Sequence, residues 1–292
     1  MHQKQIFDES SNSFYYLEYK LKNPKQSDEI KTAITPFLTG QSVKVVVGFG
    51  VEVCQGLFEG EYPEKLITFP DYKGPNTSMP GTQNDLLFWI HSQDEGANFQ
   101  MALRINQALK ELGSLELEER GFTYLDSRDL TGFVDGSANP KEDKRFPAAL
   151  IPQGKKGENG SYMMTQKWVH DLEHFNKVPV PTQEKIIGRT KEDSIELEGD
   201  EMPEDSHVSR TDVKVDGIPY KIYRRSAPFG TIKENGLFFI AFSCELVRFE
   251  TMLERMVGQG GPQDQIMNYS RAVSGSYWFC PSQTLLDATF GG

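Results

Sequence analysis

Hydrophobic and polar positions in the first half of the chain alternate between strand-like and helical spacing. Strand-like runs rich in β-branched and aromatic residues occupy 14–19, 43–50 and 86–92. Helical spacing over 24–38 puts Ile30, Ile34, Phe37 and Leu38 on one face, and a second helix is predicted over about 96–112. A final strand is predicted from the alternation over 115–125. This half therefore predicts strands and helices in alternation.

The second half repeats this pattern. Strands are predicted over 160–169 and 236–243, and a helix over 247–257. The run Leu86–Ile90 with its following helix resembles Leu237–Ala241 with its following helix, about 150 residues later. We therefore expect a duplicated α+β fold with sheets packed between helices, in two domains at 1–145 and 146–292.

Two charged segments interrupt the pattern. Residues 141–159 are charged and contain two glycines, so we expect a mobile loop or linker there. Residues 191–205 carry eight acidic side chains and favour a solvated loop, because their spacing matches no calcium-binding pattern.

Composition excludes several classes of partner. The 292-residue chain has a formal net charge of −11, which disfavours nucleic acid or an anionic membrane as the main partner. No segment approaches the roughly 20 apolar residues of a membrane span, and the first residues predict no signal peptide. The three cysteines lie far apart, which favours buried thiols in a reducing cytoplasm.

Candidate chemistry begins at the stretch Gly132–Pro140. Asp135 lies there between glycines, which let a backbone pass close to a bulky ligand, although Asp-Gly is also an ordinary turn dipeptide. Arg224 and Arg225 follow a strand-like run and should point to opposite faces. One of them can therefore enter a pocket.

The histidines offer one plausible metal ligand. His91 ends a buried-looking strand and is expected to be structural. His170 and His174 should share a helix face, but no third ligand accompanies them, which favours surface or packing roles. His207 stands alone, and a single neutral imidazole suffices to hold a haem iron.

Four motifs in order resemble dye-decolorising peroxidases, and specifically their compact intracellular bacterial subgroup. They are Gly132-Phe133-Val134-Asp135-Gly136, Ile187-Gly188-Arg189-Thr190-Lys191, Ser206-His207-Val208, and the run from Tyr223 to Gly230. The likeness continues through Gly236–Ile240 and Ser270–Gly275 and covers nearly the whole chain.

The resemblance implies a duplicated ferredoxin-like fold that holds one haem b per chain in its C-terminal half. It assigns His207 as the iron ligand, and Asp135 and Arg224 as catalytic residues that act on hydrogen peroxide. Cofactor contacts are also implied for a further set: Gly136, Ser137, Arg189, Arg224 and Ser226. A cytoplasmic homo-oligomer, a dimer or larger, is expected.

Two positions depart from the family pattern. Asn268 stands where many members have an aspartate that could hold the second nitrogen of the iron-bound histidine, so we expect a neutral partner for His207. Ala138 replaces a frequent glutamate, which argues against manganese oxidation.

The function implied is a haem b peroxidase that reduces peroxide through an oxyferryl intermediate and oxidises organic donors such as dyes or phenols. An alternative is a haem- or porphyrin-handling protein with little peroxidase turnover. A ferredoxin-like binding module without haem is a third possibility.

Overall fold

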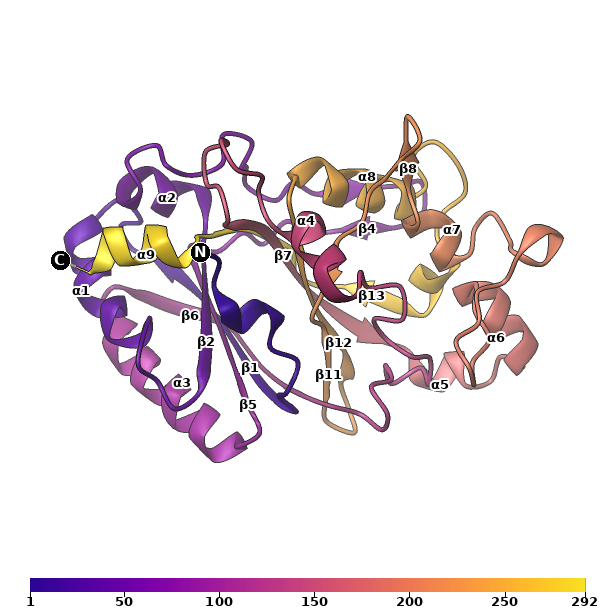
Figure 1. Cartoon of the computed structure of the whole chain (residues 1–292). Coiled ribbons are helices and arrows are strands. Elements are labelled where there is room, and N and C mark those ends of the chain that lie inside the picture. The colour runs from indigo at the N-terminus through magenta and orange to yellow at the C-terminus, as the bar shows by residue number, and fades with distance from the viewer. Residues whose placement is uncertain (292) are drawn as a thin grey trace.

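The computed structural model describes residues 1–291 and shows mixed helices and antiparallel sheet (Figure 1). Strands of the first half pair in the order β6-β1-β5-β2. Its main elements are β1 (Ser13–Leu21), α1 (Ser27–Ile34), β2 (Lys44–Phe49), α2 (Val51–Leu57), β5 (Leu86–Ser92), α3 (Glu95–Leu109) and β6 (Gly113–Phe122). A small hairpin of β3 (Tyr72–Lys73) and β4 (Ser78–Met79) lies between α2 and β5.

The second half repeats this strand order. Its strands pair as β14-β7-β12-β11, so that in both halves the fourth strand lies beside the first, then the third, then the second. The strands are β7 (Ser161–His170), β10 (Tyr223–Arg224), β11 (Ala227–Gly230), β12 (Asn235–Ser243), β13 (Ser270–Ala272) and β14 (Ser276–Cys280). The helices are α4 (Arg145–Ala149), α5 (Leu172–Phe175), α6 (Val180–Ile187), α7 (His207–Thr211), α8 (Leu246–Met256) and α9 (Gln283–Phe290). The hairpin β8 (Lys214–Val215) and β9 (Ile218–Pro219) completes this half. The fold is the expected duplicated, ferredoxin-like α+β arrangement.

The two sheets join into a closed ring of strands. One residue pair links β11 to β6, at Phe229 and Gly121, and one pair links β14 to β2, at Phe279 and Phe49. Large apolar side chains from both sheets fill the inside of the ring as one buried cluster, including Tyr16, Trp89, Phe238 and Trp278.

Helices cover the outer faces of the ring. In Figure 1, α1 and α3 lie against the first sheet, and α8 lies over the second. The C-terminal helix α9 also packs on the first half, where Phe290 lies against Phe49 and Phe58 with ring centroids 6.1 and 6.5 Å away. Among residues 1–291, no helix combines the length and the apolar run that crossing a membrane requires.

Several local expectations need correction. The predicted loop at 141–159 contains a 3₁₀ turn at Glu142–Lys144 followed by α4, because residues 145–149 pack two buried alanines against the fold. The predicted helix at 24–38 is shorter than expected, since α1 ends at Ile34 and passes into a 3₁₀ turn that contains Pro36.

The predicted pairing of His170 and His174 on one helix face is wrong. His170 ends strand β7, whereas His174 lies in the short helix α5 beyond it. His91 is fully buried inside the ring, where its Nδ1 lies 2.8 Å from the Ser11 hydroxyl. Burial lowers the pKa of His91 to about 3, so this side chain is neutral at ordinary pH.

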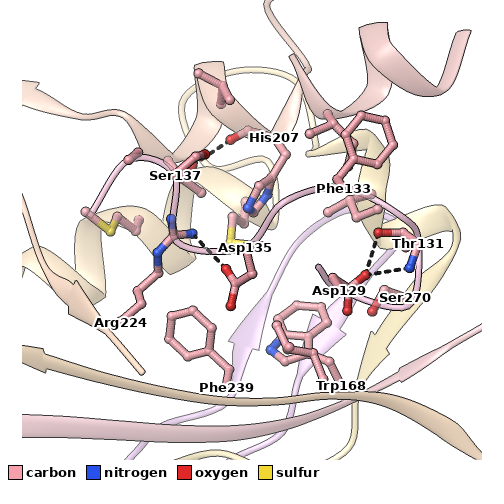
Figure 2. Close-up of a pocket in the computed structure, with 18 of the residues that line it drawn as sticks. Asp129, Thr131, Phe133, Asp135, Ser137, Trp168, His207, Arg224, Phe239 and Ser270 are labelled. Atoms are coloured by element: carbon pink, nitrogen blue, oxygen red, sulfur yellow. Dashed lines mark hydrogen bonds and ion pairs between the residues drawn. The ribbon is translucent and has the colours of Figure 1, made fainter. Parts of the chain in front are cut away.

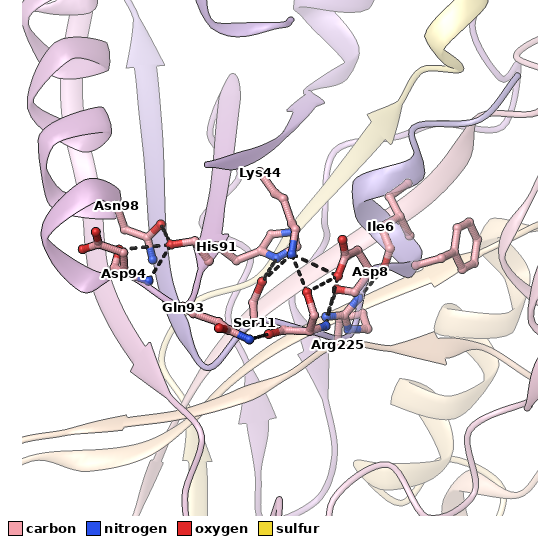
Figure 3. Close-up of polar contacts among 12 residues, drawn as sticks. Ile6, Asp8, Ser11, Lys44, His91, Gln93, Asp94, Asn98 and Arg225 are labelled. Atoms are coloured by element: carbon pink, nitrogen blue, oxygen red, sulfur yellow. Dashed lines mark hydrogen bonds and ion pairs between the residues drawn. The ribbon is translucent and has the colours of Figure 1, made fainter. Parts of the chain in front are cut away.

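Arg225 holds the segment that precedes β1 against the ring of strands through hydrogen bonds (Figure 3). Its guanidinium donates to the carbonyl oxygens of Ile6 at 2.6 Å and Asp8 at 2.8 Å, and it lies over the Trp89 ring. Lys44 pairs with the Asp8 carboxylate at 3.0 Å. The segment before β1 is therefore held by charged groups that emerge from β2 and from the end of β10.

We expect Arg225→Ala to lower the free energy of unfolding by roughly 2–4 kcal/mol, because two carbonyls lose a charged donor. Urea denaturation followed by circular dichroism measures this loss. The matched control is Arg224→Ala, one residue earlier and on the opposite face, with an expected loss below about 1 kcal/mol. Equal losses in the two variants would contradict the role given to Arg225.

Candidate active site

A cavity lies on the outer face of the second sheet, between that face and helices α7 and α8. Alternate residues of β7 and β12 line it, including Gln166, Trp168, Leu237 and Phe239, while their neighbours such as Phe238 point inside the ring. The cavity has a volume of about 210 Å³ and opens to solvent.

Asp135 reaches the cavity from a loop that its own backbone geometry shapes. Gly132 and Gly136 adopt φ values of +90° and +75°, a region that favours glycine. Arg128 holds the loop from outside, donating to the Gly132 carbonyl at 2.9 Å and to the Lys191 carbonyl at 2.6 Å. The Asp135 carboxylate therefore projects from a fixed turn into the cavity (Figure 2).

Arg224 reaches the same cavity from β10 and faces Asp135. Its Nη1 lies 3.9 Å from Asp135 Oδ1, and both side chains are about one-fifth exposed, at 23% and 21%. Asn139 ties their two segments together: its amide donates to the Arg224 carbonyl at 2.8 Å and accepts from the Arg224 backbone N–H at 3.0 Å. The distance between the acid and the arginine is thus set by a side chain outside the pair.

His207 is the first residue of α7, which begins with Ser206 as its N-cap. Its Nδ1 lies 2.7 Å from Oδ2 of Asp264, whose side chain is fully buried. The expectation that Asn268 would hold His207 is wrong, because the chain turns through Gln265–Asn268 and brings the residue before that turn against the imidazole. The partner of His207 is therefore a carboxylate.

Nothing in residues 1–291 hydrogen-bonds to Nε2 of His207, which lines the cavity. An imidazole fixed by a carboxylate on one nitrogen and open on the other is the arrangement of a metal-ligating histidine. No group of three or more His, Cys, Asp or Glu side chains within this part of the chain could hold a metal ion.

The remaining predicted site residues divide into two groups. Arg189 and Ser137 line the cavity, whereas Gly136 and Ser226 do not. Arg189 follows Gly188, which ends α6 in the left-handed conformation, and its guanidinium pairs with Glu196. The Ser226 hydroxyl is buried and has no hydrogen-bond partner among the described residues.

Burial and charge set the protonation of the cavity acids. Burial raises the pKa of Asp135, and the Arg224 charge, the Gly136 N–H and the nearby His207 oppose that rise only in part. The charge of Asp129 acts in the same direction as burial. Asp135 is therefore poised to take up or release a proton at a higher pH than an ordinary aspartate.

Sequence reasoning missed three polar residues of this site. Asp264 was overlooked because a four-residue 3₁₀ turn separates it from the motif that suggested Asn268. The position of Asn139 before Pro140 indicates only a turn, although an amide can bond both backbone groups of a neighbouring strand. His170 continues the alternation of β7 by two residues beyond Trp168, and this alternation is the signal that places it on the cavity face.

The residues present fit a haem. A single histidine with an open Nε2 can serve as the iron ligand, and the Arg189 guanidinium can pair with a carboxylate group of the porphyrin. The walls are largely apolar, as a porphyrin requires, through Val208, Ile222, Leu237, Phe239, Met252, Leu253, Met256 and Ile266.

Comparisons with protein families identify both halves of the chain. The description "Dyp-type peroxidase, N-terminal" matches residues 4–123, and "Dyp-type peroxidase, C-terminal" matches residues 126–285.

Individual relatives and solved structures agree with the family match. A dye-decolorizing peroxidase of Mycobacterium tuberculosis is 36% identical over 84% of this chain and 75% of that protein. The dye-decolorizing protein from V. cholerae has a TM-score of 0.89 and 36% identity, covering 98% of this chain and 99% of that one. A Rhodococcus jostii DypB variant solved in complex with heme has a TM-score of 0.88 and 31% identity, covering 95% and 96%.

The relatives that would support the alternative, a haem-handling protein, match this chain less well than the peroxidases do. A Yersinia pestis protein named deferrochelatase is 24% identical over 52% of this chain and 41% of that protein. The comparisons therefore support the peroxidase interpretation rather than this alternative.

We expect Asp264→Asn to raise the iron(III)/iron(II) potential of the haem-loaded protein, because a neutral partner makes the His207 imidazole a weaker electron donor. Spectroelectrochemical titration measures the midpoint. Asn268→Asp is the control and should leave the midpoint unchanged, since His207 Nδ1 bonds to Asp264 and not to Asn268. A shift in the control alone would restore the original assignment of Asn268.

Proposed function

The chain belongs to the Dyp-type peroxidase family and is a haem-dependent peroxidase; from that premise we propose that Asp135 and Arg224 carry out the cleavage of hydrogen peroxide. The observation that carries the proposal is that these two side chains share one cavity with the open nitrogen of His207. When bound there, haem supplies an iron that binds peroxide and accepts its oxidising equivalents.

His207 is the proposed ligand of the haem iron, with Asp264 orienting its ring. Arg189 would meet a carboxylate of the porphyrin at the rim, exchanging part of its contact with Glu196. Ser137 lines the cavity and would contact the cofactor. Gly136 and Ser226 lie behind the cavity lining, and we propose that they shape the pocket rather than touch its surface.

Asp135 is the proposed proton carrier. Cleavage of peroxide requires a proton to move from the inner oxygen to the outer oxygen, which then leaves as water. An ionised carboxylate takes the proton, and the protonated acid returns it. The raised pKa of Asp135, caused by its burial, suits both steps, because an acid near its pKa exchanges protons readily in either direction.

Arg224 is the proposed fixed charge. Its guanidinium remains protonated and donates hydrogen bonds to the departing oxygen, where negative charge develops. It also favours the ionised form of Asp135, which must be the starting state. Asn139 holds the Arg224 backbone at the distance that both tasks require.

Organic donors such as dyes or phenols supply the electrons of the cycle. Small phenols are of a size to approach the cavity, whereas bulky dyes require a route through the protein surface. The buried aromatic side chains beside the cavity include Trp168, and residues of this type can carry such a route.

Three features of the whole protein extend the proposal. We propose a cytoplasmic location, supported by three buried free cysteines that suit a reducing compartment. We propose a homo-oligomer, a dimer or larger, supported by Phe99 and Leu103, which are 45% and 53% exposed and four residues apart on α3. We also propose two domains, 1–145 and 146–292, supported by the repeated strand order.

We expect Asp135→Ala and Arg224→Ala each to slow the reaction with peroxide by about 10² or more, with Arg224→Ala at least as severe. Stopped-flow mixing with peroxide, followed at the Soret band, measures the rate. The control is Arg225→Lys, at the next residue and on the opposite face, and this variant should react with peroxide at a rate close to that of the wild type. Unchanged rates in both alanine variants would contradict the proposed division of roles.

We expect the rate of the peroxide reaction to fall at low pH, with a midpoint above the pKa of a free aspartate. Burial raises the pKa of Asp135, and the ionised form of this acid starts the reaction. Arg224→Leu removes a charge that lowers this pKa, so its acid limb should move to still higher pH. Arg224→Lys keeps a positive charge and should shift the limb less. Rate–pH profiles of the three proteins test the order, and a Leu variant with an unmoved limb would contradict it.

A further inference from the structure

A second polar chain lies along the cavity wall, apart from Asp135 and Arg224. His170 forms its centre: its Nε2 lies 3.0 Å from Asp129 Oδ1, and its Nδ1 lies 2.7 Å from the Ser270 hydroxyl. All three residues line the cavity, and Figure 2 shows Asp129 and Ser270 together on the side away from Arg224. Asp129 comes from the loop that carries Asp135, His170 from strand β7 and Ser270 from strand β13.

The hydrogen bonds fix where the protons lie. Burial alone would raise the pKa of Asp129, but hydrogen bonds and charge from His170, together with Thr131, lower it, so the carboxylate is ionised. Its Oδ2 accepts from the Thr131 backbone N–H at 2.9 Å and from the Thr131 hydroxyl at 2.5 Å. An ionised carboxylate is only an acceptor, so Nε2 of His170 carries the proton that it shares with Asp129.

In the neutral form of the His170 ring, one acceptor nitrogen remains, which is Nδ1. The Ser270 hydroxyl donates to that nitrogen, and its oxygen faces the cavity with a free lone pair. A proton that arrives at the Ser270 oxygen can be passed on, because the serine gives its own proton to Nδ1. The positive imidazolium that results stays paired with Asp129, with 6% and 14% of the two side chains exposed.

We propose that Asp129, His170 and Ser270 form a second acid–base relay, which takes up the proton of a phenolic donor when that donor is oxidised. The proposal rests on the peroxidase function above. The phenol O–H bond breaks, its proton passes to the Ser270 oxygen while the serine proton moves to His170 Nδ1, and one electron leaves for the enzyme that peroxide has oxidised. The product is a neutral phenoxyl radical, and the proton is later released to solvent.

Two classes of electron donor distinguish a proton-transfer role of these three residues from a purely structural role, in which they would only hold the loop of Asp135 in place. A phenol such as guaiacol loses both a proton and an electron, whereas a sulfonated azine dye such as ABTS loses only an electron. Loss of a tether would displace the turn that carries Asp135 and would slow the reactions of peroxide and of both donors together. Loss of a proton relay slows the phenol alone.

The experiment compares His170→Gln and Ser270→Ala with wild type in the haem-loaded enzyme. Because glutamine retains a donor for Asp129, and alanine removes only a hydroxyl, both variants should keep the turn in place. We expect kcat/KM for guaiacol to fall roughly tenfold to hundredfold. Turnover of ABTS and the peroxide-induced Soret change should stay within about twofold. His174→Gln, 63% exposed on α5, is the matched control and should leave all three unchanged.

A readout without turnover tests the same geometry. Nitrogen-15 NMR of the full-length protein should find the neutral ring of His170 protonated at Nε2 and not at Nδ1. Protonation at Nδ1 would overturn the relay, as would equal losses with guaiacol and ABTS or no loss with guaiacol. A wild type that fails to change its Soret band with peroxide would instead overturn the proposed function.

Discussion

The alternation of side chains along the central pair β7 and β12 is the constraint on which the site depends. These strands pair over eight residues, from Gly236 with Val169 to Ser243 with Tyr162. Inner side chains fill the ring that the two sheets close, and outer side chains form the cavity wall. A slip of one residue would exchange the two faces, so the packing of the ring also fixes the chemistry of the cavity.

The same principle divides the two adjacent arginines. Arg224 faces the cavity and Asp135, while Arg225 reaches the carbonyls that precede β1. Arg224 is thus the proposed catalytic residue, and its neighbour Arg225 holds the fold. Because Arg224 ends β10 and Arg225 follows it directly, the N-terminal segment that Arg225 holds also stabilises the short strand that carries the Arg224 side chain.

The turn at 129–139 is held at both ends by side chains from other elements. His170 binds Asp129 at its beginning, and Asn139 binds the backbone of Arg224 at its end. Asp135 lies between these two attachments. The proposed proton transfer by Asp135 therefore does not require the loop to order itself at each turnover, which is the benefit of a preorganised site.

The sequence alone determined the duplicated α+β pattern, the glycine-flanked loop that carries Asp135, and the family motifs, because strand periodicity and glycine-rich turns are local properties. It could not determine that Asp264 rather than Asn268 contacts His207, since a 3₁₀ turn decides which residue reaches the imidazole. Nor could it place His170 between Asp129 and Ser270, which lie 41 and 100 residues away in the chain. Such contacts between distant segments exist only after the sheet register is set, and tertiary structure alone decides them.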